Sequence, residues 1–145
     1  MKKFELTTNT KIYFGKTLFQ VKALISFGSV KAGDLGGFIE KEENIDHSGD
    51  AWVSGDAWVS GDAQVSGDAQ VSGDDQIIWV SKVGSENGTL TAYKDKDGEI
   101  LVSRGCFFGT MDEFERAVER THGDSKFGVE YRLIIQLIKM RLGAE

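Results

Sequence analysis

Cysteine and histidine are the side chains best suited to nucleophilic or metal chemistry, and the chain has only three of them. Cys106 follows a predicted strand, and His122 stands at the end of the next predicted helix. A thiol beside an imidazole can act as a nucleophile with its general base, or both groups can bind a metal ion. A structural zinc ion normally takes four ligands, so Asp124, Asp112 or Glu115 would have to complete the shell.

The structural alternative for the same residues is simpler. Cys106 would be a small buried thiol, and His122 would benefit from the negative end of a helix dipole. We favour this alternative, because one cysteine and two histidines are few ligands for a metal centre. The sequence therefore predicts no catalytic residue, no cofactor and no metal site, with Cys106, His122 and Asp124 as the metal-ligand candidates.

A six-residue unit, Val-Ser-Gly-Asp-Ala-(Trp/Gln), recurs from Val53 to Gln76. Repetition at a fixed period indicates units that stack on their neighbours. The valines and alanines alternate with outward residues, as in a half-buried strand, and Gly-Asp suits a turn. Three units per circuit predict a triangular coil, a short left-handed parallel β-helix like that of hexapeptide-repeat acyltransferases.

Weaker matches extend the repeat back to Leu35, with His47 at a valine position. Repeat stacks need caps at their open ends, so both flanks are expected to cover the coil. The predicted fold class is mixed and mainly β, in one folding unit. Its predicted parts are an N-terminal β-hairpin cap (1–34), the hexapeptide-repeat β-helix (35–76), and a C-terminal β-hairpin with two α-helices (77–145), the helices at 111–122 and about 125–142.

Charge is uneven along the chain. Residues 35–76 carry one lysine against ten acidic residues, a net charge of −9, whereas residues 1–34 carry six lysines against two acids, a net +4. We call the acids of the predicted Gly-Asp turns the turn aspartates: Asp50, Asp56, Asp62, Asp68 and Asp74. In the predicted coil, Asp50 lies one circuit from Asp68, and Asp56 one circuit from Asp74. They either keep the fold soluble or form an acidic surface that meets a basic partner.

Two tryptophans in the repeats, Trp52 and Trp58, point outward by the same alternation. A narrow triangular interior has no room for them. They are either covered by the flanking hairpins or exposed as anchors for a partner, because tryptophan is enriched at binding hot spots.

Several function classes are disfavoured. No apolar run is long enough to span a bilayer, the start lacks the apolar stretch of a signal peptide, and a single cysteine suits a reducing cytoplasm. The repeats carry no basic patch, phosphate-binding glycine loop or paired-cysteine zinc finger. Direct nucleic-acid binding is therefore disfavoured, although the basic first 34 residues leave it open.

The residues from Val30 to Glu40, followed by Gly-Asp-Ala hexads, are similar to the opening of uncharacterised hexapeptide-repeat proteins of phages and prophages. The tail from Gly105 through Phe114, with Thr121-His122-Gly123, resembles a module of the same proteins. The resemblance implies a phage or mobile-element origin and supports the fold expectation. It implies no substrate.

The expected function is that of a non-catalytic, phage-type binding protein in the host cytoplasm. It would inhibit a host defence machine, as an anti-CRISPR protein does, through the turn aspartates with Trp52 and Trp58. Its partner would be a host protein, for example a nucleic-acid-binding nuclease complex. One alternative is a structural protein that self-associates as a homo-oligomer. The other is a hexapeptide-repeat acyltransferase with His47 or His122 as general base, although two circuits leave little groove for a coenzyme A donor.

Overall fold

The computed structural model describes residues 2–105 and 107–143, and of Asp74 the backbone only. The chain divides into two compact units, Met1–Asp74 and Asp75–Glu145. We refer to them as the first and second unit and describe each by itself.

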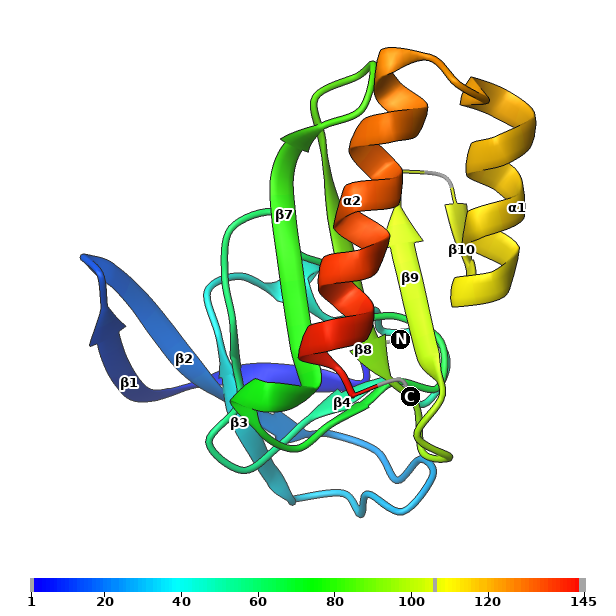
Figure 1. The fold of residues 1–145 in the computed structure, drawn as a ribbon. Helices are drawn as coiled ribbons and strands as arrows, with labels where there is room; N and C mark the ends of the chain where they lie inside the picture. Colours follow the sequence, from blue (N-terminus) through cyan, green and yellow to red (C-terminus); the bar gives the residue numbers. More distant parts are fainter. Residues whose placement is uncertain (1, 106, 144–145) are drawn as a thin grey trace. The chain divides into compact units, whose positions relative to one another are not determined.

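The first unit begins with a long β-hairpin, formed by β1 (Phe4–Tyr13) and β2 (Lys16–Ala23). Phe14 and Gly15 connect the strands, and both have positive φ angles, 51° and 78°. A two-residue turn of this kind matches the natural twist of antiparallel strands. β2 then pairs antiparallel with β3 (Leu35–Ile39). The hairpin extends beyond β3, so its far end projects from the unit (Figure 1).

The hexads bury their small and branched side chains, as the repeat predicts. They form three two-residue strands, β4 (Trp52–Val53), β5 (Trp58–Val59) and β6 (Gln70–Val71). The turn glycines between them have positive φ angles, which glycine adopts without strain. The buried hexad residues, each at most 1% exposed, are Ala51, Val53, Ala57, Val59, Ala63, Val65, Ala69 and Val71.

The predicted left-handed parallel β-helix is nevertheless wrong. β5 pairs parallel with β3 in a mixed four-stranded sheet of order β1-β2-β3-β5, in which the other pairs are antiparallel. β4 and β6 form a separate two-stranded parallel sheet. Among the described residues, the hexads thus pair within two different sheets rather than in one regular solenoid. The protein is mainly β, with several sheets, mixed and antiparallel, and two helices.

A break in the six-residue phase explains part of this difference. Ile45 bridges to Val65, twenty positions ahead, whereas Val53 pairs with Val71, eighteen positions ahead. Two extra residues therefore lie between Ile45 and Val53. Ile45, and not His47, takes the valine position of its unit, and His47 is displaced from the repeat.

A buried asparagine replaces the expected Gly-Asp turn in the same region. The segment η1 (Glu42–Asn44) is a 3₁₀ turn, and Asn44 is completely buried. Its Oδ1 accepts a hydrogen bond from the Glu40 N–H (3.1 Å), and its Nδ2 donates to the carbonyl oxygens of Gly61 (3.1 Å) and Ala63 (2.8 Å). The Asn44 side chain thus connects the irregular segment, by hydrogen bonds, to the turn at residues 61–63.

The second unit consists of an antiparallel sheet and two helices. The sheet has the order β10-β9-β8-β7, and a 3₁₀ turn, η2 (Asp74–Gln76), precedes it. The bounds are β7 (Ile77–Val83), β8 (Gly88–Lys94), β9 (Ile100–Arg104), β10 (Phe107–Thr110), α1 (Met111–His122) and α2 (Lys126–Arg141).

Both predicted helices are confirmed, and their starts have the expected caps. The Thr110 side chain accepts a hydrogen bond from the Glu113 N–H (3.2 Å), and the Glu113 side chain accepts one from the Thr110 N–H (2.8 Å). This reciprocal pair is a capping box. Ser125 caps α2 through the Gly128 N–H. Gly123 follows α1 with a positive φ angle of 50°, so it ends the helix where the sequence predicted.

The core of the second unit lies between the sheet and the helices. α2 runs along one face of the sheet (Figure 1), and its predicted apolar stripe is buried there with Leu90 and Val102 of the sheet. The buried stripe residues are Tyr131, Ile134, Ile135, Ile138 and Leu142.

Within the described residues, no helix is long and apolar enough to cross a membrane.

Candidate binding surface

Most of the turn aspartates are open to solvent. Asp56, Asp62 and Asp68 are exposed, and Asp50 is half-buried. The side chain of Asp74 lies outside the described part of the structure. Asp62 has 78% of its side chain exposed and still forms an ion pair with Lys41 at 3.0 Å, which in this setting contributes little to stability.

The structure brings two of these turns together. The pairing of Trp52 with Gln70 places Asp50 level with Asp68. A Cβ atom at Gly49 would lie 3.0 Å from the carbonyl oxygen of Gly67, so the two turns pack directly on each other. The Asp56 turn packs in the same way on the segment after β6, because a Cβ atom at Gly55 would lie 2.5 Å from the carbonyl oxygen of Ser72. The acidic turns therefore stack on neighbouring turns of the repeat.

Trp52 is not an exposed anchor. Its side chain is 5% exposed, and its ring packs edge-on against Phe27 (5.3 Å between centroids) and Phe4 (6.4 Å). The N-terminal strand and the segment after β2 therefore cover it. Of the two alternatives for Trp52, covering by the flanking segments is confirmed, and its place among the binding residues is corrected.

Trp58 has a different environment. It is half-buried in β5, and its ring lies 5.2 Å from that of Tyr13 and 6.5 Å from that of Phe14. Tyr13 and Phe14 stand at the far end of the β1–β2 hairpin. The tryptophan thus supports the end of the hairpin and shares one aromatic cluster with it.

This end of the hairpin is an exposed feature that the sequence-based prediction did not include among the candidate binding residues. We call residues 12–16 the hairpin tip. Ile12 is 73% exposed and Phe14 is 91% exposed. The sequence signal is the run Ile-Tyr-Phe directly before Gly-Lys, which lies within the predicted hairpin cap. Exposed aromatic side chains that are held in place are typical anchors of protein interfaces.

Two lysines, one beside the hairpin tip and one within it, contact other residues of the first unit. The Nζ atom of Lys11 lies 4.4 Å from the centroid of the Phe38 ring, a cation–π contact. The Nζ atom of Lys16 lies 3.6 Å from a carboxylate oxygen of Glu40. The hairpin that presents the exposed side chains therefore contacts β3 and the residue that follows it through these two lysines.

His47, the candidate general base of the first unit, has partners for both ring nitrogens. Its Nδ1 accepts a hydrogen bond from the Lys3 N–H (3.0 Å), and its Nε2 lies 3.1 Å from a Glu42 carboxylate oxygen. The ring also stacks on Phe4, with centroids 4.2 Å apart. Lys2 pairs with Glu42 at 3.0 Å and lowers the pKa of that carboxyl. A proton transfer at His47 would have to break one of these bonds.

Lys3 is buried beside the same group. It is 1% exposed, and its Nζ donates to the carbonyl oxygens of Ala51 (2.7 Å) and Gly49 (3.3 Å). Burial lowers the pKa of this lysine to about 8, while Asp46 and Asp50 oppose the shift. The amine therefore joins the first strand to the Gly49-Asp50 turn.

The predicted metal-ligand candidates of the second unit do not form a described metal site. Cys106 lies outside the described residues. Asp124 is fully exposed and lies 3.8 Å from Arg132, and the His122 ring stacks on Tyr131 with centroids 5.6 Å apart. In residues 2–105 and 107–143, no three His, Cys, Asp or Glu side chains are placed to hold a metal ion.

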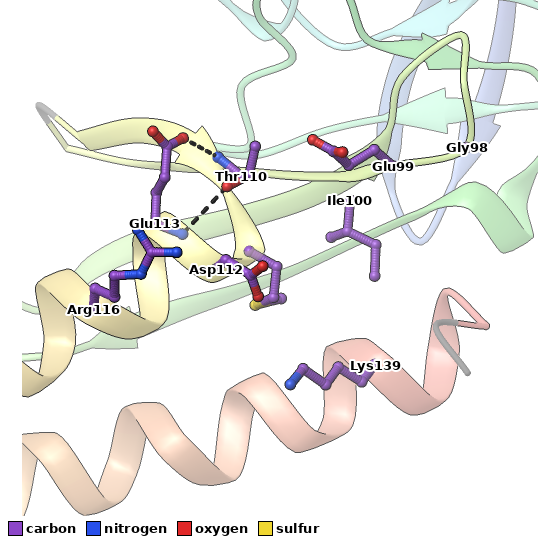
Figure 2. Close-up of a pocket in the computed structure, with 9 residues that line it drawn as sticks. Gly98, Glu99, Ile100, Thr110, Asp112, Glu113, Arg116 and Lys139 are labelled. Atoms are coloured by element: carbon purple, nitrogen blue, oxygen red, sulfur yellow. Dashed lines mark hydrogen bonds between the residues drawn. The ribbon is translucent and has the colours of Figure 1, made fainter.

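A large open pocket of about 870 Å³ lies beside the start of α1. Figure 2 shows Glu113 turned back to cap Thr110, and Lys139 reaching toward the pocket from α2. The Thr110 N–H lowers the pKa of Glu113, and Lys139 pairs with Glu115 at 2.9 Å. The described residues that line the pocket include no serine, cysteine or histidine. Of their charged groups, Glu113 caps α1 and Lys139 forms an ion pair.

The chain matches no protein-family model and none of the curated proteins with which it was compared. The resemblance to phage hexapeptide-repeat proteins therefore stays a prediction. The feature that best supports a function is the hairpin tip with Trp58, next to the exposed turn aspartates.

Proposed function

We propose that the protein is a non-catalytic, phage-type binding protein that inserts its hairpin tip into a partner protein. The observation that carries the proposal is Phe14, which is 91% exposed and has a φ angle of 51°. A left-handed conformation costs a residue with a side chain about 1–2 kcal/mol, and turns of this kind prefer asparagine or glycine. Phe14 therefore exposes a large apolar side chain and also strains the backbone. Both features are unfavourable for folding, and strained positions of this kind point to a role in function.

The neighbours of Phe14 support an anchoring role. Tyr13 and Trp58 contact the same cluster, so the tip is partly ordered before it binds. Burying one large apolar side chain in a partner contributes roughly 1.5–3 kcal/mol to the binding free energy. Less of this gain is offset by lost side-chain entropy when the side chain is already held in place before binding. A shallow apolar pocket on the partner would suit Phe14 and Ile12.

Charge suggests the class of partner. Residues 35–76 carry a net charge of −9, and Asp56, Asp62 and Asp68 are exposed. An acidic surface favours association with a basic one. A host enzyme that normally holds nucleic acid, such as a CRISPR nuclease complex in the host cytoplasm, presents such a surface. The proposed role is inhibition of that machine by occupying its basic groove.

Capture of partners from host lysate, compared between variants, tests this function. The charge variant is Asp56→Lys, Asp62→Lys and Asp68→Lys together, and the tip variant is Phe14→Asn. The matched control carries the same charge change on exposed acids of the second unit, Asp97→Lys, Glu119→Lys and Asp124→Lys. We expect the first two variants to lose partners that the wild type and the control retain. Retention of every partner by the tip variant would remove the proposal.

A second candidate function, self-association, is favoured by one observation on α2. The side of this helix opposite the core is also apolar: Val129, Leu133, Leu137 and Met140 are 48%, 63%, 38% and 73% exposed. Their spacing places them on one helix face. Contiguous exposed apolar surface of this kind often marks an interface, and a second copy of the chain could cover it.

A further inference from the structure

A second cavity of the second unit, of about 280 Å³, combines an aromatic lining with two nitrogen-bearing side chains. Phe114 contacts both Phe107 (5.3 Å between centroids) and Tyr131 (5.5 Å) in edge-on geometry. Arg104 from β9 and His122 from the end of α1 line the same cavity. Mostly apolar pockets with a few convergent polar groups are the usual form of small-molecule sites.

The Arg104 guanidinium is held in place but not saturated. Its side chain is only 12% exposed. Nε donates to the Tyr131 hydroxyl at 2.9 Å, and Nη2 donates to the Val83 carbonyl at 3.4 Å. A guanidinium has five N–H donors, so among the described residues three of them lack an acceptor within hydrogen-bond distance. The carboxylate of Glu86 lies 3.7 Å away and is itself 81% exposed.

His122 adds a second polar group without a partner. Its ring stacks on Tyr131 and lies 5.9 Å from Phe127, but neither ring nitrogen hydrogen-bonds to any described residue. An imidazole N–H can donate to an anion. The ring is therefore held by aromatic contacts, while its polar atoms remain available.

Two glycines make room for this arrangement. A Cβ atom at Gly84 would collide with the Tyr131 hydroxyl and would lie 2.8 Å from Nη2 of Arg104. A Cβ atom at Gly88 would lie 3.0 Å from the Arg104 Cζ atom. Any other residue at Gly84 would displace the Arg104–Tyr131 pair, so the backbone is shaped around the guanidinium.

From these observations we propose that the cavity binds a small carboxylate with an aromatic or branched apolar body. The carboxylate accepts hydrogen bonds from the unused Arg104 donors and from His122, and the apolar body lies against Phe107 and Phe114. Arginine suits this role because its planar donors match a carboxylate in a paired geometry. Glu86 is an exposed partner at 3.7 Å, and a bound anion would compete with it for the largely buried positive charge. This site is independent of the hairpin tip and of the proposed function.

The carboxylate could come from a free metabolite or from the C-terminus of a peptide, and both offer the same chemistry. The test is a titration of the full-length ¹⁵N-labelled protein, followed by NMR, with N-acetyl-L-phenylalanine and with a short peptide that ends in phenylalanine. The comparison compound is N-acetyl-L-phenylalanine amide, which keeps the apolar body and lacks the charge. We expect saturable shifts of the Gly84, Gly88 and His122 amides with both acids. Tighter binding of the peptide would assign the site to a protein C-terminus, and equal binding would assign it to a free carboxylate.

The amide should bind at least about tenfold more weakly than the acid, and Arg104→Lys should weaken binding of the acid about tenfold or more, because the paired geometry is lost. Glu86→Gln serves as a surface variant that leaves the core intact. It removes the carboxylate nearest the guanidinium and should tighten binding about two- to fivefold. No saturable shift, equal binding of acid and amide, or unchanged affinity in Arg104→Lys would overturn the proposal. If Arg104→Lys does not fold, Glu86→Gln decides, and unchanged or weaker binding then overturns it.

Discussion

The ring of Tyr13, at the end of the first hairpin, lies 5.2 Å from the ring of Trp58 in the repeats, at an interplanar angle of 42°. This contact joins the hairpin tip to the acidic segment, so an exposed aromatic group and exposed carboxylates belong to the same unit. It also explains why Trp58 is half-buried although the repeat points it outward.

Replacing Phe14 should separate folding from binding. Phe14→Asn places a residue that tolerates the left-handed conformation in the same turn. We expect a gain of about 0.5–1 kcal/mol in the free energy of unfolding, together with loss of partner binding. Urea unfolding followed by tryptophan fluorescence measures the first effect. A clear loss of stability would mean that the Phe14–Trp58 contact outweighs the strain, and that Phe14 serves the fold.

Lys3 should make stability depend on pH in the alkaline range. In the folded protein its pKa is about 8, against an ordinary value of 10.5. Between these values the unfolded chain binds more protons than the folded chain, so stability rises as pH increases from 8 to 10.5. The expected rise is about 2–3 kcal/mol, absent below pH 8. Unfolding curves of the wild type and of Lys3→Met across this range measure it, because only the wild type carries this titration. Parallel pH profiles for the two proteins would contradict the assignment.

Asn44 should be essential for the irregular turn that replaces a hexad. Its side chain makes four hydrogen bonds, to two backbone N–H groups and two carbonyl oxygens. Asn44→Ala removes all four bonds. The Glu40 N–H keeps its bond to the Val59 carbonyl oxygen (3.0 Å), but the Lys41 N–H and the carbonyl oxygens of Gly61 and Ala63 each lose the Asn44 partner. Loss of a partner for a buried group costs about 1–3 kcal/mol. We expect destabilisation of about 2–4 kcal/mol in denaturant unfolding. The neighbouring exposed change Glu43→Ala should alter stability by less than about 0.5 kcal/mol, and equal effects of the two changes would refute the role.

Self-association through α2 has a direct readout. Leu133→Lys with Met140→Lys places two charges on the exposed apolar face without touching the buried one. If two copies pair there, light scattering should give a dimer mass for the wild type and a monomer mass for the variant. The exposed change Asp97→Lys, in the turn between β8 and β9, shifts the charge by the same amount outside α2. It is the control and should keep the wild-type mass. A monomeric wild type at high concentration would exclude this second function.

The local parts of the fold could be predicted from the sequence, because they depend on short-range rules. The capping box of Thr110 and Glu113 and the stop at Gly123 place α1, and the stripe that begins at Tyr131 gives the buried face of α2. The burial of the hexad valines follows from alternation alone. These features need no knowledge of distant partners.

The overall arrangement could not be predicted in the same way. The predicted strict period passes through His47, where two extra residues shift the phase. The hydrogen bonds of the buried Asn44, which stabilise that segment, join it to residues that follow β5 in the chain. Pairing of β2 with β3 turns the first hexad into part of a mixed sheet. The covering of Trp52 by Phe27 and the contact between Tyr13 and Trp58 depend on where the chain returns in space.

Site-specific photo-crosslinking shows whether the hairpin tip itself touches a partner. The photoreactive residue p-benzoylphenylalanine replaces Phe14 in one protein and Phe108, which is 47% exposed in the second unit, in another. Both are irradiated in host lysate. If the hairpin tip is the anchor, position 14 yields a discrete crosslinked host protein, position 108 does not yield it, and the product disappears when unlabelled wild type competes but persists when Phe14→Asn competes. The same product from both positions, or none from position 14, would mean that the hairpin tip is not the anchor.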